Sequence, residues 1–110
     1  MDLNLIVLCG RLAADGELRV FDSGAKLIRY LVTVRVDHPR RRIDVIPVTL
    51  WDPPAELVDS PGTKGERVWV CGSVQRRFSE SPDGRRSRIE VVAEQVNFKD
   101  VEDLEPATSK

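Results

Sequence analysis

The sequence predicts a single domain built almost entirely of β-strands. Patterns with the 3.6-residue period of an amphipathic helix are nearly absent, and short runs rich in β-branched residues recur between turn signals. A length of 110 residues suits one domain, and 41% hydrophobic residues suffice for a small core. Because a core of this size leaves little margin of stability, we expect the protein to associate with further copies of itself.

The alternation of apolar residues and turn residues divides the chain into strands. Strands are expected at residues 3–12, with 17–21 as a continuation after a turn, and at 26–36, 43–51, 66–78 and 86–98. Gly10 marks a bend or bulge in the first strand, and Pro47, which lacks an N–H, marks an edge or bulge in the third. One short helix is expected near residues 55–60, before Pro61 and Gly62.

Five strands with one short helix between the third and the fourth is the order of an OB-fold. This all-β fold is a five-stranded Greek-key barrel, and its sheet face and loops bind oligonucleotides or oligosaccharides. We expect extended hairpins on the barrel. The domain is expected to span residues 1–100, and a short acidic segment at 101–110 is expected to be frayed.

The net charge of −1 conceals a segregation of charge along the chain. Residues 19–88 carry 14 Lys and Arg against 9 Asp and Glu, whereas residues 1–18 and 89–110 are acidic. Five of these arginines lie between Arg76 and Arg88, around a Pro-Asp-Gly turn. A basic middle between acidic ends fits a polyanionic partner, and a well-solvated surface of mixed charge is the alternative.

Side-chain parity places aromatic residues on the outside of two strands. The even-numbered residues from 46 to 50 are apolar and should face the core, so Trp51 should face outward with Thr49. An outward Trp beside basic loops is a candidate platform for nucleobases, with Lys and Arg on the phosphates. Alternatively, Trp51 covers the barrel end or lies in an oligomer interface. Trp69 also opposes the core parity, and we favour an interface role for it because few charges flank it.

Nothing in the sequence predicts catalysis, a cofactor or a metal site. His38 is the only histidine, and no phosphate-binding loop, nucleophile elbow or paired-Cys motif is present. Cys9 and Cys71 lie in apolar runs and are expected to be buried, reduced thiols; a disulfide would require that their strands be neighbours. No apolar run approaches the ~20 residues that span a membrane, and the first residues do not resemble a signal peptide. We therefore expect a cytoplasmic protein.

Three segments carry a more specific signal: GRLAADGELR at 10–19, VTLWDPPAE at 48–56 and KGERVWVCG at 64–72. In this order and spacing they resemble the bacterial single-stranded-DNA-binding protein (SSB) family, and the likeness runs from about Asn4 to Phe98. The resemblance implies an OB-fold homotetramer that wraps single-stranded DNA without sequence preference. It also implies aromatic stacking, basic contacts, and neither cofactor nor metal.

The resemblance assigns roles to three residues. Trp51 falls where the family carries a stacking aromatic, and Lys64 and Arg77 fall where it carries DNA-contacting cations. With the other basic residues of the strands, loops and second hairpin, the expected DNA-binding residues are Trp51, Phe78, Arg11, Arg29, Arg35, Arg40, Arg41, Arg42, Lys64, Arg76, Arg77, Arg85, Arg86 and Arg88.

The chain also departs from the family pattern. His38 and Val45 stand where typical members often have Trp. The hairpin aromatic of the family corresponds to Ser79, and Phe78 comes one residue early, on the parity of core residue Val74. Phe78 therefore faces DNA only if a bulge restores its direction, and otherwise packs inside. The chain ends without the acidic tip through which members recruit replication and repair proteins, as expected for a tail-less short form or paralogue, or for a chain trimmed to its ordered domain.

These observations predict a protein that binds and protects single-stranded DNA during replication, recombination and repair, in association with the nucleoid. One alternative is an SSB-derived module of the primosomal type, which bridges proteins and binds DNA weakly. Another is an OB-fold protein that binds RNA or tRNA.

Overall fold

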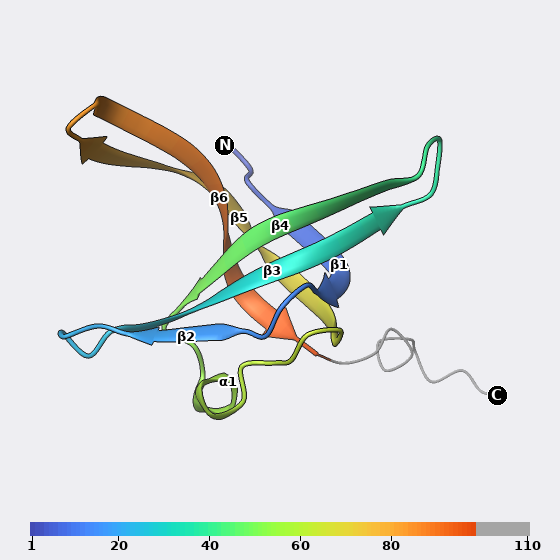
Figure 1. Cartoon of the computed structure of the whole chain (residues 1–110), viewed down its shortest axis with the longest axis horizontal. Coiled ribbons are helices and arrows are strands. Elements are labelled where there is room, and N and C mark those ends of the chain that lie inside the picture. Colours follow the sequence, from blue (N-terminus) through green and yellow to red (C-terminus); the bar gives the residue numbers. More distant parts are fainter. Residues whose placement is uncertain (99–110) are drawn as a thin grey trace.

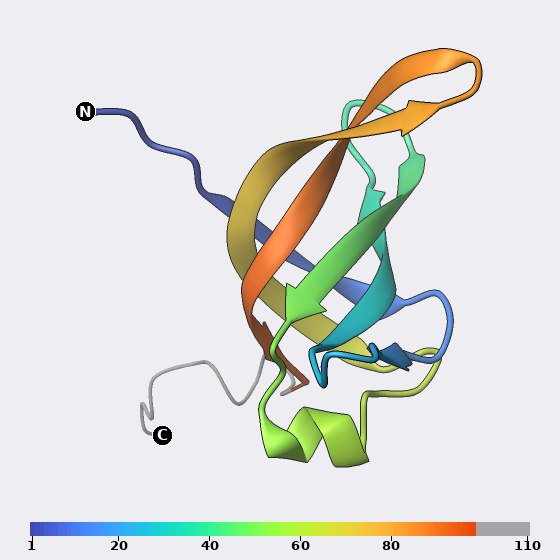
Figure 2. The ribbon, with the colours of Figure 1, turned by 90° about the vertical axis from the view of Figure 1, so that its left-hand side faces the viewer.

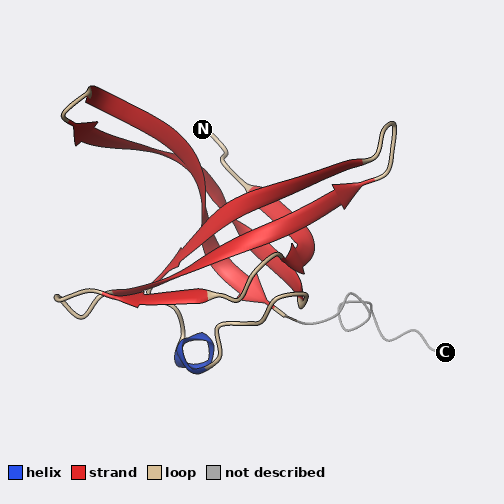
Figure 3. Ribbon diagram, viewed as in Figure 1, coloured by secondary structure: helices blue, strands red, loops and turns tan. Residues whose placement is uncertain are grey.

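The computed structural model of the protein describes residues 1–98 and contains six strands and one helix (Figures 1 and 3). In chain order these are β1 (Ile6–Leu12), β2 (Glu17–Val20), β3 (Lys26–Val36), β4 (Arg42–Trp51), α1 (Ala55–Asp59), β5 (Arg67–Ser81) and β6 (Gly84–Asn97). The predicted segment 101–110, and the end of the predicted domain, lie outside the described residues.

The strands form one sheet that closes on itself. Their order is β1-β5-β6-β4-β3-β2, and β1 also pairs with β3 at Arg11 and Leu12, which closes the barrel. All pairings are antiparallel except the short one between β4 and β6. Helix α1 lies beneath one end of the barrel, between β4 and β5 (Figure 2). The structure confirms the predicted OB-fold, with one difference in strand count: residues 17–20 form a separate strand paired with β3.

The core is built by every second residue of the long strands. It contains Leu12, Ile28, Tyr30, Val32, Val48, Leu50, Val68, Val70, Val91 and Ala93. The predicted inward parity of β3, β4 and β5 is therefore confirmed within the barrel. Each large apolar side chain that is fully buried contributes roughly 1.5–3 kcal/mol to the free energy of folding.

Two glycines permit close approach of neighbouring strands. A Cβ at Gly10 would collide with the carbonyl oxygen of Thr33, at the point where β1 meets β3. A Cβ at Gly72 would collide with the carbonyl oxygen of Val92, beside the register shift between β5 and β6. The register between β1 and β5 is continuous through Gly10, so this residue permits a close strand approach and does not form the predicted bulge.

Two long hairpins, β3–β4 and β5–β6, extend beyond the barrel (Figure 1). Along most of the first hairpin β4 has only β3 as a neighbour, because its pairing with β6 covers only Val48–Leu50. Pro47 stands just before this pairing, on the open edge of β4, as its missing N–H predicts.

The expectation of buried thiols was wrong. Cys9 is exposed, Cys71 is partly buried, and both are free. Cys9 lies opposite Trp69 on adjacent strands, and Cys71 lies opposite Val7. The four side chains share the outer face of the barrel because their strand positions have the parity opposite to the core residues Val68 and Val70. The apolar runs around the cysteines therefore reflect an apolar outer face as well as a core.

Candidate nucleic-acid interface

The outer face of the β3–β4 hairpin is both apolar and basic. Four cross-strand pairs cover it: Arg29 with Thr49, Leu31 with Pro47, Thr33 with Val45, and Arg35 with Ile43. Leu31, Ile43 and Val45 are exposed, and the two arginines make no salt bridge within residues 1–98. A surface of this kind offers apolar contact to bases and positive charge to phosphates.

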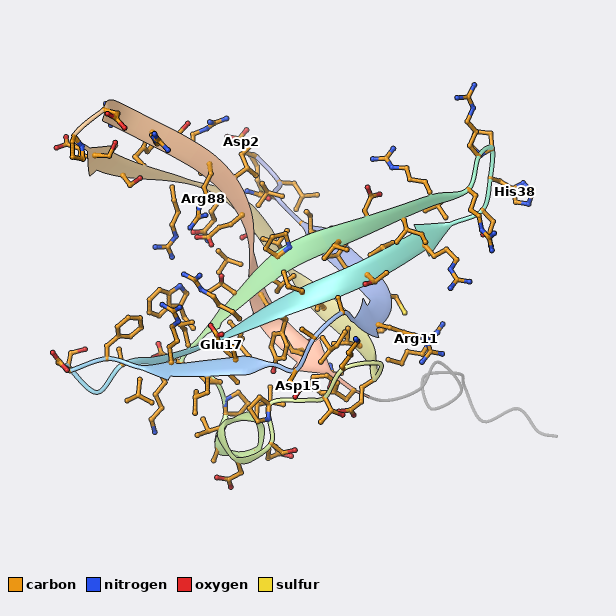
Figure 4. The ribbon with its side chains drawn as sticks, in the orientation of Figure 1. Asp2, Arg11, Asp15, Glu17, His38 and Arg88 are labelled. Carbon is orange, nitrogen blue, oxygen red and sulfur yellow. The ribbon has the colours of Figure 1, made fainter. Side chains whose placement is uncertain are left out.

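A groove of about 420 Å³ crosses the base of this face. Its floor contains Arg29, Leu31 and Pro47; residues 14–17 form one wall and residues 88–90 of β6 form the other. Figure 4 shows Arg88 on one side, and Asp15 and Glu17 on the other. The groove thus runs between the β2 side of the barrel and the base of the β5–β6 hairpin.

Trp51 lies where β4 ends, and it has partners from both sides of that strand. Its ring stacks on Phe21, with ring centroids 5.8 Å apart and planes inclined by 20°. The guanidinium carbon of Arg77 lies 5.5 Å from the centroid of the Trp51 ring, within the range of a cation–π interaction. Trp51 is half-buried, as expected for a side chain with such neighbours.

A carboxylate holds Arg77 in this position. Arg77 forms a salt bridge with Glu90, which also accepts a hydrogen bond of 3.2 Å from the Thr49 hydroxyl. Thr49 is buried, although strand parity predicted that it would face outward with Trp51. The reason is that β6 lies beside β4 here, so that Glu90 reaches Thr49.

The β5–β6 hairpin divides its arginines between two faces. Arg77 lies opposite Arg88, and Ser79 lies opposite Arg86, on the face that meets the groove. Arg76 and Arg85 have the opposite parity and lie on the back of the hairpin. Of the five arginines of the hairpin, three therefore lie on the face that meets the groove and two lie on the opposite face.

Within residues 1–98, no group of three or more His, Cys, Asp or Glu side chains is arranged to hold a metal ion. None of the described helices is long and apolar enough to cross a membrane.

Comparison with known proteins identifies the family of the chain. The sequence profile of the family described as "Single-strand binding protein family" matches residues 3–99. The chain belongs to this family. The resemblance found in the sequence is thereby confirmed over nearly the whole described domain.

Individual members of the family align well. The chain is 37% identical over 103 residues to single-stranded DNA-binding protein 3 of Listeria innocua, covering 87% of this chain and 63% of that protein. It is 36% identical over 115 residues to the single-stranded DNA-binding protein of Halalkalibacterium halodurans, covering 98% of this chain and 64% of that protein. The chain thus spans somewhat less than two thirds of the length of these relatives.

A solved structure has the same fold. A chain of the Plasmodium falciparum SSB complex with single-stranded DNA superposes with a TM-score of 0.77 at 22% sequence identity, covering 91% of this chain and 97% of that chain. This likeness confirms the fold of the family.

Phe78 follows neither of the two alternatives predicted for it. The register of β5 and β6 continues unbroken from Gly72 to the hairpin turn, so no bulge redirects Phe78 toward the Arg77 face. Its side chain is nevertheless 58% exposed, because the hairpin has left the barrel at this point. The Arg85 guanidinium lies 4.7 Å from its ring centroid. Phe78 and Arg85 thus form a separate pair on the back of the hairpin.

The remaining basic residues that were predicted to bind DNA lie in two other regions, the tip of the β3–β4 hairpin and the loop before β5. Arg40, Arg41 and Arg42 lie at the tip of the β3–β4 hairpin, where Arg42 pairs with Asp44 at 3.0 Å. Arg11 donates a hydrogen bond of 3.1 Å to the carbonyl oxygen of Gly65, which places it beside Lys64. The backbone N–H of Lys64 donates to Asp15 Oδ1 at 2.8 Å. Figure 4 shows Arg11 on the other side of the barrel from Arg88.

Sequence reasoning missed two residues of this interface. Sequence patterns place Phe21 only at the end of a strand and assign no role to Glu90. Strand periodicity gives no signal for either, because it does not specify which residues meet when Phe21 approaches Trp51 across β2, β3 and β4, and Glu90 approaches Arg77 across the β5–β6 hairpin.

Proposed function

We propose that the protein binds single-stranded DNA without reading its sequence and protects it during replication, recombination and repair in association with the nucleoid. The observation that carries the proposal is the combination of arginines and exposed apolar side chains along one groove, whose lining residue Glu90 pairs with the Arg77 that lies over Trp51. Its relatives in the family are named as single-stranded DNA-binding proteins. The activity needs no cofactor and no chemical step.

In the proposed mode of binding, phosphates lie on the arginines and bases stack on aromatic rings. The free cations Arg29, Arg35 and Arg88 line a continuous path from the β3–β4 hairpin to the base of the β5–β6 hairpin. Arg77 would leave Glu90 for a phosphate, or remain in place as one side of the Trp51 site. Phe78 and Arg85 would bind a strand that passes around the back of the hairpin.

We also infer a homotetramer, in keeping with the expectation from the family. Leu3, Leu5, Val7 and Cys9 form an exposed stripe along β1 and the residues before it. Trp69 and Cys71 continue the stripe on β5. Among the described residues, the edge of β1 before Arg11 has no partner strand on its β3 side, so it offers both backbone groups and an apolar face to another copy.

The test of the proposed function is a titration with oligo-dT of several dozen bases, monitored by tryptophan fluorescence at two salt concentrations. A Trp69→Phe variant isolates the signal of Trp51. We expect strong quenching that weakens at the higher salt, because each phosphate contact contributes about −0.7 to the slope of log K against log salt. Unquenched fluorescence together with no competition by longer strands would contradict the proposal, and a matched RNA oligomer that competes better than DNA would favour an RNA-binding role.

A partner-bridging role has one observation in its favour. Phe78 and Ile89 are both exposed and have the same strand parity on the β5–β6 hairpin, and Ile89 also lines the groove. Exposed apolar pairs of this kind can bind proteins. Mixing the protein with replication proteins in the absence of DNA, with a Phe78→Ser variant as control, tests this second function.

A further inference from the structure

A second exposed aromatic ring stacks on Trp51. Phe21 is 41% exposed, although one side of its ring is stacked on Trp51. Of the other aromatic side chains in residues 1–98, Tyr30 is buried in the core, Phe98 packs beside Tyr30, Trp69 is on the β5 outer face and Phe78 is on the back of the hairpin. Phe21 is therefore the exposed ring that adjoins Trp51.

The ring of Trp51 is less accessible than that of Phe21. Phe21 approaches it from the β2–β3 turn and Arg77 approaches it from β5, and in the sheet these elements lie on opposite sides of β4. A base can stack on Trp51 only over the surface that these neighbours leave open. Phe21 has no cation–π partner among the described residues, so its solvent-facing side is open.

The backbone holds Phe21 in place. Its N–H donates to the carbonyl oxygen of Ala25 at 2.8 Å, and its own carbonyl oxygen accepts from the N–H of Gly24, also at 2.8 Å. Gly24 has a φ of +93°, which favours glycine and closes this tight turn. A ring fixed in this way loses little conformational entropy when a ligand stacks on it.

Positive charge adjoins the pair of rings through Arg77, whose guanidinium carbon lies 5.5 Å from the Trp51 ring centroid. Lys26 lies opposite Val20 in the pairing of β2 with β3, so strand alternation places it on the other face of this ribbon from Phe21. Arg77 is therefore the cation that a phosphate beside these rings would meet.

We propose that Phe21 is a base-stacking residue, and that Phe21 and Trp51 form one extended aromatic platform for consecutive nucleotides of a single strand. This inference rests on the proposed binding of single-stranded DNA. The alternative role for Phe21 is a hydrophobic cover for Trp51 that never touches the ligand. The two roles differ in whether a nucleobase contacts the Phe21 ring.

The sequence allows a direct test of that contact. Trypsin cleaves after Lys and Arg, so each aromatic residue of the chain falls in a different peptide: Phe21 in 20–26, Tyr30 in 30–35, Trp51 in 43–64, Trp69 in 68–76, Phe78 in 78–85 and Phe98 in 89–99. The protein is irradiated in complex with oligo-dT that carries 5-iodouracil at scattered positions, then digested and analysed by mass spectrometry. We expect crosslinks in both the 20–26 and 43–64 peptides.

Substitutions measure the contribution of the ring. Phe21→Leu keeps an apolar cover on Trp51 but removes the aromatic face, and we expect it to weaken oligo-dT binding at least about fivefold. Phe21→Tyr keeps the aromatic face and should bind within about twofold of wild type. Thermal unfolding of both variants checks that the β2–β3 turn is intact.

The outcomes separate this inference from the proposed function. If wild type does not bind oligo-dT, the proposed function fails and the inference fails with it. If wild type binds and crosslinks at 43–64 but not at 20–26, the proposed function stands and the stacking role of Phe21 is overturned, whatever the affinity of Phe21→Leu. Crosslinks at 20–26 together with weaker binding by Phe21→Leu would support the inference.

Discussion

At the scale of single residues, Trp51 is positioned by two side chains, Phe21 and Arg77. Replacement by Ala removes the surface on which Phe21 stacks and over which Arg77 lies. We expect Trp51→Ala to weaken binding of oligo-dT by about 1–3 kcal/mol, the increment of one stacked base, as measured by calorimetry. A Trp51→Ala protein that keeps its oligomeric state and binds as wild type does would remove Trp51 from the site.

Glu90 limits the positive charge of the groove because it pairs with Arg77. Glu90→Gln should free the guanidinium for a phosphate. We therefore expect tighter binding at low salt and a salt slope steeper by up to about 0.7, the value of one more phosphate contact. Glu94→Gln, an exposed carboxylate on the same strand, is the matched control. Equal effects of the two substitutions would show that only the net charge matters.

Tyr30 makes the free energy of unfolding depend on pH in the alkaline range. Its hydroxyl is buried without a hydrogen-bond partner among residues 1–98. Burial raises the pKa of Tyr30 to about 12, and the nearby charge of Glu66 adds to this increase. The unfolded chain releases the same proton near pH 10. The free energy of unfolding therefore keeps this contribution below pH 10 and loses it, in total roughly 2–3 kcal/mol, as the pH rises from 10 to 12.

Tyr30→Phe removes both the proton and the unpaired hydroxyl. We expect its stability near pH 8 to be similar to or above that of wild type, because no buried polar group is left unpaired. Urea unfolding of the two proteins at pH 8, 10 and 11 makes the comparison. A loss of stability above pH 10 that is the same in both would contradict the assignment to Tyr30.

At the scale of the elements, the β5–β6 hairpin has two faces, and each face carries arginines. Strand alternation sends Arg86 and Arg88 toward the groove, and Arg76 and Arg85 away from it. Replacing the first pair by Glu should weaken binding and reduce the magnitude of the salt slope by about 1.4, the value of two phosphate contacts.

The control for this prediction is the second pair of arginines. Arg76→Glu with Arg85→Glu introduces the same change of charge on the back of the hairpin, so the smaller effect is expected there. A salt titration of both double variants decides the matter. If the back pair had the larger effect, the strand would follow the Phe78 face of the hairpin instead of the groove.

At the scale of the whole molecule, the outer stripe of β1 is the surface that we propose for assembly. Val7 lies on this stripe and is 58% exposed in the isolated chain, whereas Val20 on β2 is 59% exposed and lies away from it. We expect Val7→Asp to dissociate the tetramer and Val20→Asp to leave it intact, because only the first places a charge in the proposed interface. Sedimentation equilibrium measures the two masses. A wild-type protein that is monomeric, or a Val7→Asp protein that remains tetrameric, would contradict this.

The sequence by itself determined the fold class and the family. The two-residue period of apolar side chains located the long strands to within a few residues, and turn residues located the hairpins and the helix. These signals are local, because a strand and its turn are specified by neighbouring residues. The family followed from segments whose order and spacing along the chain are themselves sequence properties.

The two-residue period could not predict which side chains are exposed to solvent. It assigned the side of the sheet correctly for Thr49 and Phe78, but it failed on their exposure. Thr49 is buried because β6 pairs beside β4 at this point. Phe78 is exposed because the β5–β6 hairpin extends beyond the barrel. Cys9 is exposed for a related reason, since its apolar neighbours continue onto an outer face.

Only the tertiary structure decided how the candidate site is assembled. Phe21, Trp51, Arg77 and Glu90 come from four different strands or turns, and no two of them are close in sequence. Phe21 meets Trp51 across neighbouring strands, Arg77 meets Glu90 across the β5–β6 hairpin, and the pairing of β4 with β6 brings the two sets together. The free energy of the buried core maintains this pairing. A linear pattern specifies the side of each strand on which a residue lies, but contact between residues on distant strands is a property of the closed sheet.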